Sequence, residues 1–212
     1  MMSSLTHSRF GPSRGFLWKN DGSVASALSP PAVDTVSLPA GIWKLDTVHS
    51  SVSFAVKHMG VGIFRGRFER LDVTLTVDEN GSAELTGVVY ADSLTVKDEN
   101  LQAHLGSSEF FDLERYPEIS FLSRSIERAG EELDVIGALT IKDKTHPVTV
   151  QGTIAGPSET MGGAVKIGLT FETVIDRTQF GLDWNAPLPS GEMALGEEVS
   201  LTVELELVHD EG

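Results

Sequence analysis

Residues 199–207 read VSLTVELEL, and this stretch decides the class of fold. Its odd positions are apolar and its even positions are Ser, Thr or Glu, which is the period of a β-strand with one buried and one solvated face. Residues 71–77, LDVTLTV, repeat the pattern. The sequence DENG at residues 78–81 then predicts a tight turn and an antiparallel partner strand over residues 83–91.

The rest of the chain from residue 43 onward contains further β-rich runs. Eight or more strands with one apolar face each need a common interior. We therefore predict an all-β fold, a closed or nearly closed antiparallel barrel, which also removes unpaired strand edges. Turn signals such as Gly156-Pro157 and Gly162-Gly163 separate most of the runs, which lie at residues 51–59, 62–70, 118–126, 133–141, 147–155 and 163–175.

One segment, residues 96–105, has the features of a helix. Leu101 and Leu105 are four positions apart, and Asp98 and Glu99 stand near its start, where the helix dipole favours acids. We expect this helix to act as a lid or a plug.

Composition and charge exclude several classes of protein. The 212 residues are 40% hydrophobic and 22% charged, and no run approaches the ~20 apolar residues of a membrane-spanning helix. Sixteen Lys and Arg stand against 31 Asp and Glu, so the net charge of −15 repels the phosphates of a nucleic acid. The absence of Cys excludes disulfides, thiolate nucleophiles and thiolate metal sites.

Residues 1–40 differ in composition from the sequence that follows. They contain eight Ser, four Pro and three Gly, and their apolar residues follow no period. We predict a flexible leader or arm over residues 1–40 and a barrel domain over residues 41–212. The best apolar run of the leader is Phe16-Leu17-Trp18, short of the roughly 7 to 15 residues of a secretory signal, so the predicted location is cytoplasmic.

Few residues suggest chemistry. None of the six histidines forms a metal-ligand motif, so no metal, cofactor or catalytic residue is predicted. His58 ends the inward row that contains Phe54 and Val56, and three interpretations of it stay open: a buried core histidine, a polar contact at a pocket mouth, or a base. Asp176-Arg177 is either a catalytic pair or a structural salt bridge or loop anchor.

The interior of the barrel has two possible states. An eight-stranded barrel is either filled by its own side chains or just wide enough for one small ligand, and the periodicity does not decide between them.

Four blocks of sequence resemble the YceI-like family of bacterial polyisoprenoid-binding proteins, in family order over about residues 42–208. The blocks are WKLD with HSSVSFAVKHM (43–46 and 49–59, followed by GRF at 66–68), HLGSSEFFD with YPEISF (104–112 and 116–121), GALTIKDKTHPV (137–148) and IDRTQFGLDWN (175–185).

The resemblance implies an extended lipocalin-like, eight-stranded antiparallel β-barrel with one short helix, holding an isoprenoid chain in an apolar bore. Three of the implied wall residues, Phe64, Leu139 and Phe171, rest partly on strand phase. The full set that would contact the ligand is Phe54, Val56, His58, Phe64, Phe68, Phe110, Phe111, Phe121, Leu139, Phe171, Phe180 and Trp184.

The function implied is non-enzymatic binding, carriage or sequestration of a polyisoprenoid or similar amphiphilic lipid, a quinone tail included. The alternative is an enzyme acting on the bound isoprenoid or quinone through His58 and Asp176-Arg177. A third hypothesis is an interaction barrel that binds a partner through residues 1–40. The expected partner is a long-chain amphiphile rather than a nucleic acid, and the resemblance also allows a homodimer.

This sequence departs from the family pattern in two places. Many relatives carry Arg-Asp where this chain has Leu101-Gln102, which predicts the loss of a polar contact at that rim. Many relatives also begin with a signal peptide and work in the periplasm.

Overall fold

The computed structural model describes residues 38–210, so the predicted leader lies outside the described residues except for its last three positions. The strands are β1 (Gly41–Leu45), β2 (Ser51–His58), β3 (Gly62–Phe68), β4 (Leu71–Val77), β5 (Ala83–Tyr90), β6 (Leu94–Thr95), β7 (Glu118–Ala129), β8 (Glu132–Ile141), β9 (Lys144–Glu159), β10 (Val165–Asp176) and β11 (Leu195–Asp210). Short 3₁₀ helices span Ala91–Ser93 and Arg177–Phe180, and the α-helix α1 spans Glu99–Gly106.

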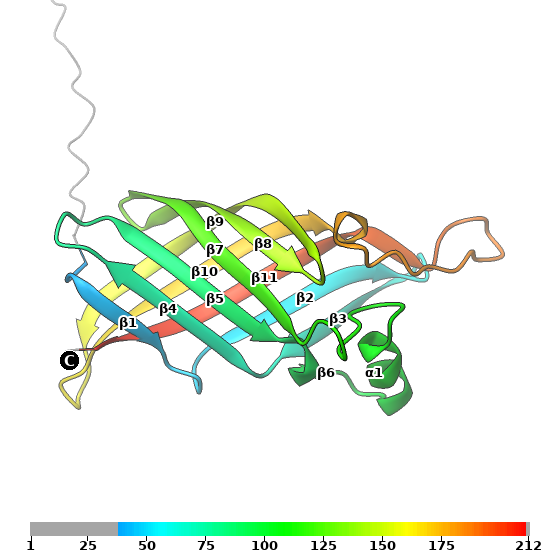
Figure 1. The fold of residues 1–212 in the computed structure, drawn as a ribbon, viewed down its shortest axis with the longest axis horizontal. Helices are drawn as coiled ribbons and strands as arrows, with labels where there is room; N and C mark the ends of the chain where they lie inside the picture. Colours follow the sequence, from blue (N-terminus) through cyan, green and yellow to red (C-terminus); the bar gives the residue numbers. More distant parts are fainter. Residues whose placement is uncertain (1–37, 211–212) are drawn as a thin grey trace, which may run out of the picture. The chain divides into compact units, whose positions relative to one another are not determined.

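Eight strands close into an antiparallel barrel (Figure 1). The ring runs β1, β4, β5, β7, β8, β9, β10, β11 and returns to β1, because β11 pairs with both β10 and β1. The predicted fold class is therefore confirmed.

The ring branches at β11. The last part of β11 pairs with β1, from Leu45 opposite Leu207, while its earlier part pairs with β2, from Ser51 opposite Glu204. Strands β3 and β6 continue this branch. Near the branch, α1 and the turns that follow it add Leu105, Phe110 and Phe111 to the buried cluster that contains Phe68.

The helix begins later than predicted, at Glu99 rather than residue 96. The Asp98 carboxylate accepts a hydrogen bond of 2.8 Å from the Leu101 amide and so caps the first turn.

The turn predicted at Gly156-Pro157 is wrong. Strand β9 continues through this dipeptide to Glu159, and the chain reverses at residues 160–164. Gly156 has a φ of +92°, and the register between β9 and β10 shifts between Lys166 and Gly168, so a β-bulge accommodates the turn-forming dipeptide inside a strand.

Buried side chains gather at the two ends of the barrel. One cluster packs mostly aliphatic side chains of the ring strands around Trp43 and Leu207, which are completely buried. The second cluster, around Phe111 and Phe180, packs α1 and its following turns against the strands. Within residues 38–210, no helix has the length and apolar character that a bilayer crossing requires.

Candidate functional site: an apolar cavity in the barrel

A cavity of about 340 Å³ lies inside the barrel. This volume is at the lower end of the roughly 300–1,000 Å³ typical of ligand pockets. Aliphatic and aromatic side chains from most of the ring strands, from β2, β3 and α1 form its wall, and the polar side chains among them are few: His58, His104, Ser120, Thr173 and Arg177. The barrel is therefore hollow rather than filled by its own side chains.

Eleven of the twelve residues expected at the wall line this cavity: Phe54, Val56, His58, Phe64, Phe68, Phe110, Phe111, Phe121, Leu139, Phe171 and Trp184. Phe180 does not line it. Its side chain is 1% exposed, and its ring lies 5.1 Å from the ring of His146. Whether the eleven contact a ligand stays a prediction.

Glycines keep the cavity open. Gly66 lies opposite Phe54 across β2 and β3, and a Cβ atom at Gly66 would lie 2.5 Å from the Phe54 ring. The rings of Phe121 and Phe171 lie closer still over Gly137 and Gly152. These three rings rest on glycine backbone in the wall, so they leave room in the interior.

His58 marks one point where the cavity reaches the surface, because it both lines the cavity and is exposed. It pairs with Leu195 at the start of β11. Across the lining, the ring of His104 packs edge-on against Trp184 at 4.9 Å, and its Nε2 lies 2.9 Å from a Glu109 carboxylate oxygen. We call the end of the cavity at His58 and Leu195 the mouth.

Leu101 of α1 also lines the cavity. It belongs to the Leu101-Gln102 pair, at which the family resemblance predicted the loss of a polar contact. The departure noted in the sequence therefore adds an apolar side chain to the wall.

Arg177 is a buried cation in this wall, with 4% of its surface exposed. Its Nε donates to the Gly196 carbonyl at 2.8 Å, and its Nη1 donates to the carbonyls of Leu182 and Trp184. Its Nη2 is buried and has no hydrogen-bond partner among the described residues. Burial lowers the pKa of Arg177 below its ordinary value. The side chain thus anchors the segment from Leu182 to Gly196, one of the roles expected for it.

Asp176 does not pair with Arg177. Its carboxylate accepts hydrogen bonds from the Thr178 amide at 2.9 Å and the Thr178 hydroxyl at 2.6 Å, and the latter is the main cause of its lowered pKa. In the described part of the chain, no hydrogen bond or ion pair joins His58, Asp176 and Arg177 to one another. The salt bridge considered for Asp176 and Arg177 is absent there.

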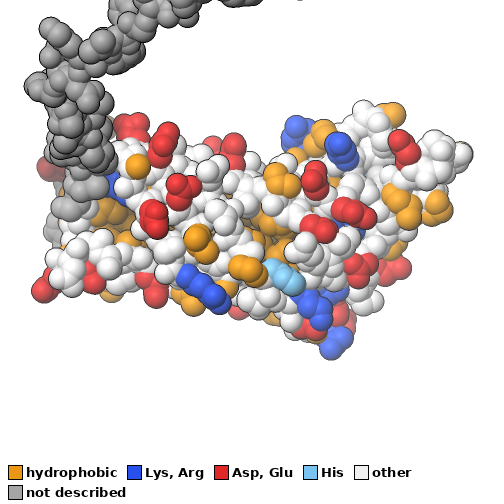
Figure 2. Space-filling view, turned by 90° about the horizontal axis from the view of Figure 1, so that it is seen from above, with side chains coloured by type: hydrophobic (Ala, Val, Ile, Leu, Met, Phe, Trp, Pro, Cys, Tyr) orange, Lys and Arg blue, Asp and Glu red, His pale blue; other side chains and the backbone are white. Residues whose placement is uncertain are grey.

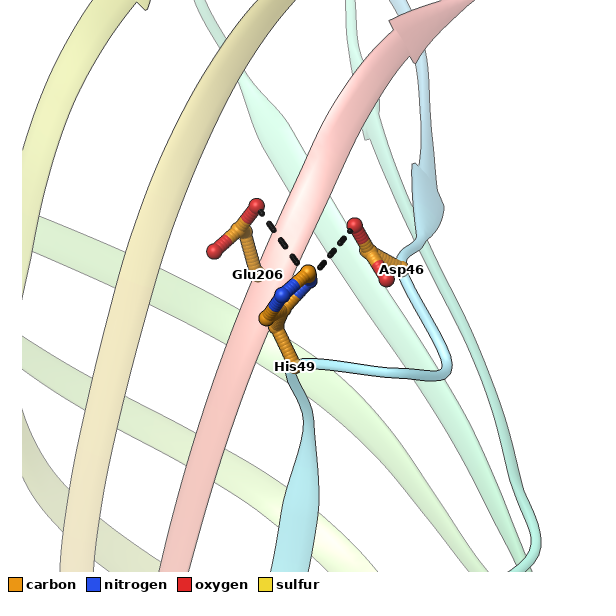
Figure 3. Close-up of side chains that lie close together, drawn as sticks. All are labelled: Asp46, His49 and Glu206. Carbon is orange, nitrogen blue, oxygen red and sulfur yellow. Dashed lines mark hydrogen bonds and ion pairs between the residues drawn. The ribbon is translucent and has the colours of Figure 1, made fainter.

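A second cluster lies where β1 and β2 meet β11 (Figure 3). His49 Nδ1 is 3.0 Å from an Asp46 carboxylate oxygen and 4.0 Å from one of Glu206. Each of these three side chains offers one possible metal-ligand atom, and the three atoms lie within 4.8 Å of one another. However, Lys166 Nζ lies 2.8 Å from Asp46 and 2.5 Å from Glu206, so an ammonium already forms ion pairs with both carboxylates. We interpret the cluster as an ion-pair network across the branch.

Sequence reasoning missed several lining residues. Arg177 could have been placed, because it follows Phe171, Thr173 and Ile175 at the inward period of β10. His104 stands in a block used for the family resemblance, yet a lone helical histidine gives no signal that it faces a cavity.

The fold and the cavity together define an antiparallel β-barrel built around an apolar internal space. The chain belongs to the YceI-like domain family, whose model matches residues 43–207. It is 31% identical over 171 residues to a UPF0312 protein of Staphylococcus epidermidis, covering 79% of this chain and 98% of that protein. It is also 31% identical over 165 residues to Protein YceI of Salmonella arizonae, covering 76% and 86%.

Two solved structures share the fold. BcnA of Burkholderia cenocepacia is 24% identical, with a TM-score of 0.65, and the match covers 76% of this chain and 98% of BcnA. A polyisoprenoid binding domain from Saccharophagus degradans is 13% identical, with a TM-score of 0.61, covering 79% of this chain and 98% of that domain.

Proposed function

We propose that this protein binds an isoprenoid or similar long-chain amphiphile inside its barrel, and carries or sequesters it without converting it chemically. The cavity of about 340 Å³ with an almost wholly hydrocarbon wall carries this proposal. The Saccharophagus domain of the same fold is described as polyisoprenoid binding, which is consistent with a ligand of this class.

The volume of the cavity sets the size of the buried part of the ligand. An apolar cavity of about 150 Å³ engineered in another protein holds benzene, so 340 Å³ has room for roughly 13 carbons, or two to three isoprene units. At ~0.8 kcal/mol per buried CH₂, this length gains about 10 kcal/mol before the cost of ordering the chain is subtracted. Longer chains would extend through the mouth.

The polar residues near the cavity support binding better than catalysis. The imidazole of His58 has no hydrogen bond to any residue in the described range, and the Asp176 carboxylate is held by Thr178. Neither is positioned to activate a nucleophile or to relay a proton with the other.

Native mass spectrometry of the full chain incubated with farnesol tests both parts of the proposal. We expect one adduct of farnesol mass, and we expect solvent extraction to return farnesol unchanged. A protein that stays unliganded in excess farnesol would contradict binding, and a product of altered mass would contradict the absence of conversion.

Gly87 offers a variant that fills the cavity. It lines the cavity, and a Cβ atom there would meet only Val73, at an ordinary contact distance of 3.7 Å. The four side-chain carbons of Gly87→Leu would displace a similar length of ligand, which at ~0.8 kcal/mol per CH₂ raises the Kd for farnesol about a hundredfold.

Thr86→Leu is the matched control, because Thr86 is exposed on the same strand. Titration followed by native mass spectrometry should show wild-type affinity for this variant. Equal affinity of the Gly87 and Thr86 variants would mean that farnesol binds elsewhere.

A cytoplasmic location and a homodimer stay predictions of the sequence.

A further inference from the structure

Exposed apolar side chains gather beside the mouth. Met59 and Val61 lie in the turn between β2 and β3, and Ile63 lies at the start of β3; they are 44%, 93% and 48% exposed. The Met59 amide donates to the Ala194 carbonyl at 2.7 Å, which brings Met193, 57% exposed, to the same place. We call these four residues the apolar tip. Hydrophobic side chains protrude at this end of the barrel, on the right of Figure 2.

The hairpin behind the tip is basic in an acidic protein. Residues 51–68 contain Lys57, Arg65 and Arg67 and no Asp or Glu, whereas the whole chain has 31 acids and 16 Lys and Arg. The inward positions of β2 and β3 line the cavity, so alternation turns these three cations outward. No carboxylate within the described range lies at ion-pair distance from Lys57 or Arg65, and Arg67 has only the exposed Glu69, at 3.6 Å.

The tip is continuous with the mouth. His58, which is exposed and lines the cavity, directly precedes Met59, and Phe64 of the lining follows Ile63. A hydrocarbon chain that leaves the cavity here reaches the apolar tip first.

We propose that the apolar tip and the cations of the β2–β3 hairpin dock on a lipid bilayer that contains anionic lipids, with the mouth facing the bilayer. This inference rests on the proposed function and names the source of the ligand. Apolar side chains enter the boundary of head groups and acyl chains, while flanking Lys and Arg attract anionic head groups. Docking at the mouth lets a lipid chain pass between bilayer and cavity without crossing water.

An acidic side chain next to the tip, that of Glu192, opposes this attraction. A Cβ atom at Gly60 would lie 2.9 Å from the Glu192 carboxylate, so this carboxylate stands beside the tip. Glu192→Gln should therefore strengthen docking on anionic vesicles.

Vesicle flotation of the full chain tests the proposal, with phosphatidylcholine vesicles that contain or lack phosphatidylglycerol. We expect flotation with the anionic vesicles and its loss at high salt. Val61→Asp, at an almost fully exposed position, should weaken flotation about tenfold or more, because a charge replaces an inserted side chain. Lys57→Gln with Arg65→Gln should remove the preference for phosphatidylglycerol.

Met161→Asp is the matched control. Met161 is fully exposed in the turn between β9 and β10, at the opposite end of the barrel (Figure 1). The Met161→Asp variant should float like the wild type. If Val61→Asp floats as well as the wild type, or if Val61→Asp and Met161→Asp lose flotation equally, the proposed docking surface is wrong.

Loading with farnesol from solution separates this proposal from the proposed function. Val61 does not line the cavity, so Val61→Asp should bind farnesol with wild-type affinity by native mass spectrometry. If Val61→Asp loads farnesol normally and also floats as well as the wild type, only the docking proposal is refuted. If the wild type fails to load farnesol, the proposed function is refuted.

Discussion

Arg177 shows how one buried charge organises the wall of the cavity. A guanidinium has five N–H donors in a fixed fork, and here three hydrogen bonds reach backbone carbonyls of Leu182, Trp184 and Gly196. The planar fork lets a single side chain donate to all three carbonyls from one position just after β10. The segment between Leu182 and Gly196 is thereby fixed against the barrel.

We predict that Arg177→Met lowers the free energy of unfolding by about 2–4 kcal/mol, because hydrogen bonds from a charged donor are lost and three carbonyls lose their partner. Urea unfolding measures this change, and hydrogen exchange should show faster exchange between residues 182 and 196. Arg124→Met, at an exposed position, should change stability by less than about 0.5 kcal/mol. Similar stability of the two variants would refute the anchoring role.

At the scale of the element, cross-strand pairs of Phe and Gly leave room in the cavity, because the rings of Phe54, Phe121 and Phe171 lie over glycine backbone. In Gly66→Ala the nearest atoms to the new Cβ belong to the side chains of Phe54 and Leu94 rather than to the backbone. We predict that the Phe54 ring moves into the cavity and that overpacking lowers stability by about 1–3 kcal/mol. A crystal structure and urea unfolding would measure both effects.

Gly87→Ala is the control for that substitution, since its Cβ would make only an ordinary contact with Val73. It should be neutral or slightly stabilising, because Ala costs less backbone entropy than Gly in a strand. An unmoved Phe54 ring in Gly66→Ala would show that the glycine is not needed.

These pairs also explain which parts of the molecule could be predicted. Alternation and an Asn-Gly turn predicted β4, β5 and β11, because both signals are local. The open cavity depends on Phe171 facing Gly152, residues 19 positions apart on neighbouring strands, and no period links them. Gly156-Pro157 misled the prediction because a dipeptide typical of turns lies in a bulged strand.

At the scale of the molecule, the ion-pair network of Asp46, Lys166 and Glu206 holds the branch of the sheet together. Hydrogen bonds from Lys166 and His49 lower the pKa of Asp46 well below its ordinary value. The unfolded value is about 3.9, so the ionised Asp46 stabilises the fold fully above about pH 5. This contribution falls as the pH drops below about 4 and through the folded pKa.

We therefore predict that Asp46→Asn lowers the free energy of unfolding by about 1–2 kcal/mol at pH 6, between the values for exposed and buried pairs. The difference from the wild type should shrink as the pH falls from about 5 toward about 2, because Asp46 then takes up a proton in the unfolded wild-type chain while it is still ionised in the folded one. Urea unfolding across this pH range measures it. A difference that is constant with pH would mean that the charge of Asp46 contributes nothing.

The three rings lying over glycines have an evolutionary consequence. At Gly66 a Cβ atom would meet only side chains, so a larger residue there changes the width of the cavity while the main-chain hydrogen bonds stay in place. At Gly137 and Gly152 it would also meet the backbone carbonyl oxygens of Leu122 and Thr170. Proteins that descend from one ancestral barrel can thus come to accept lipid chains of different width before their fold changes.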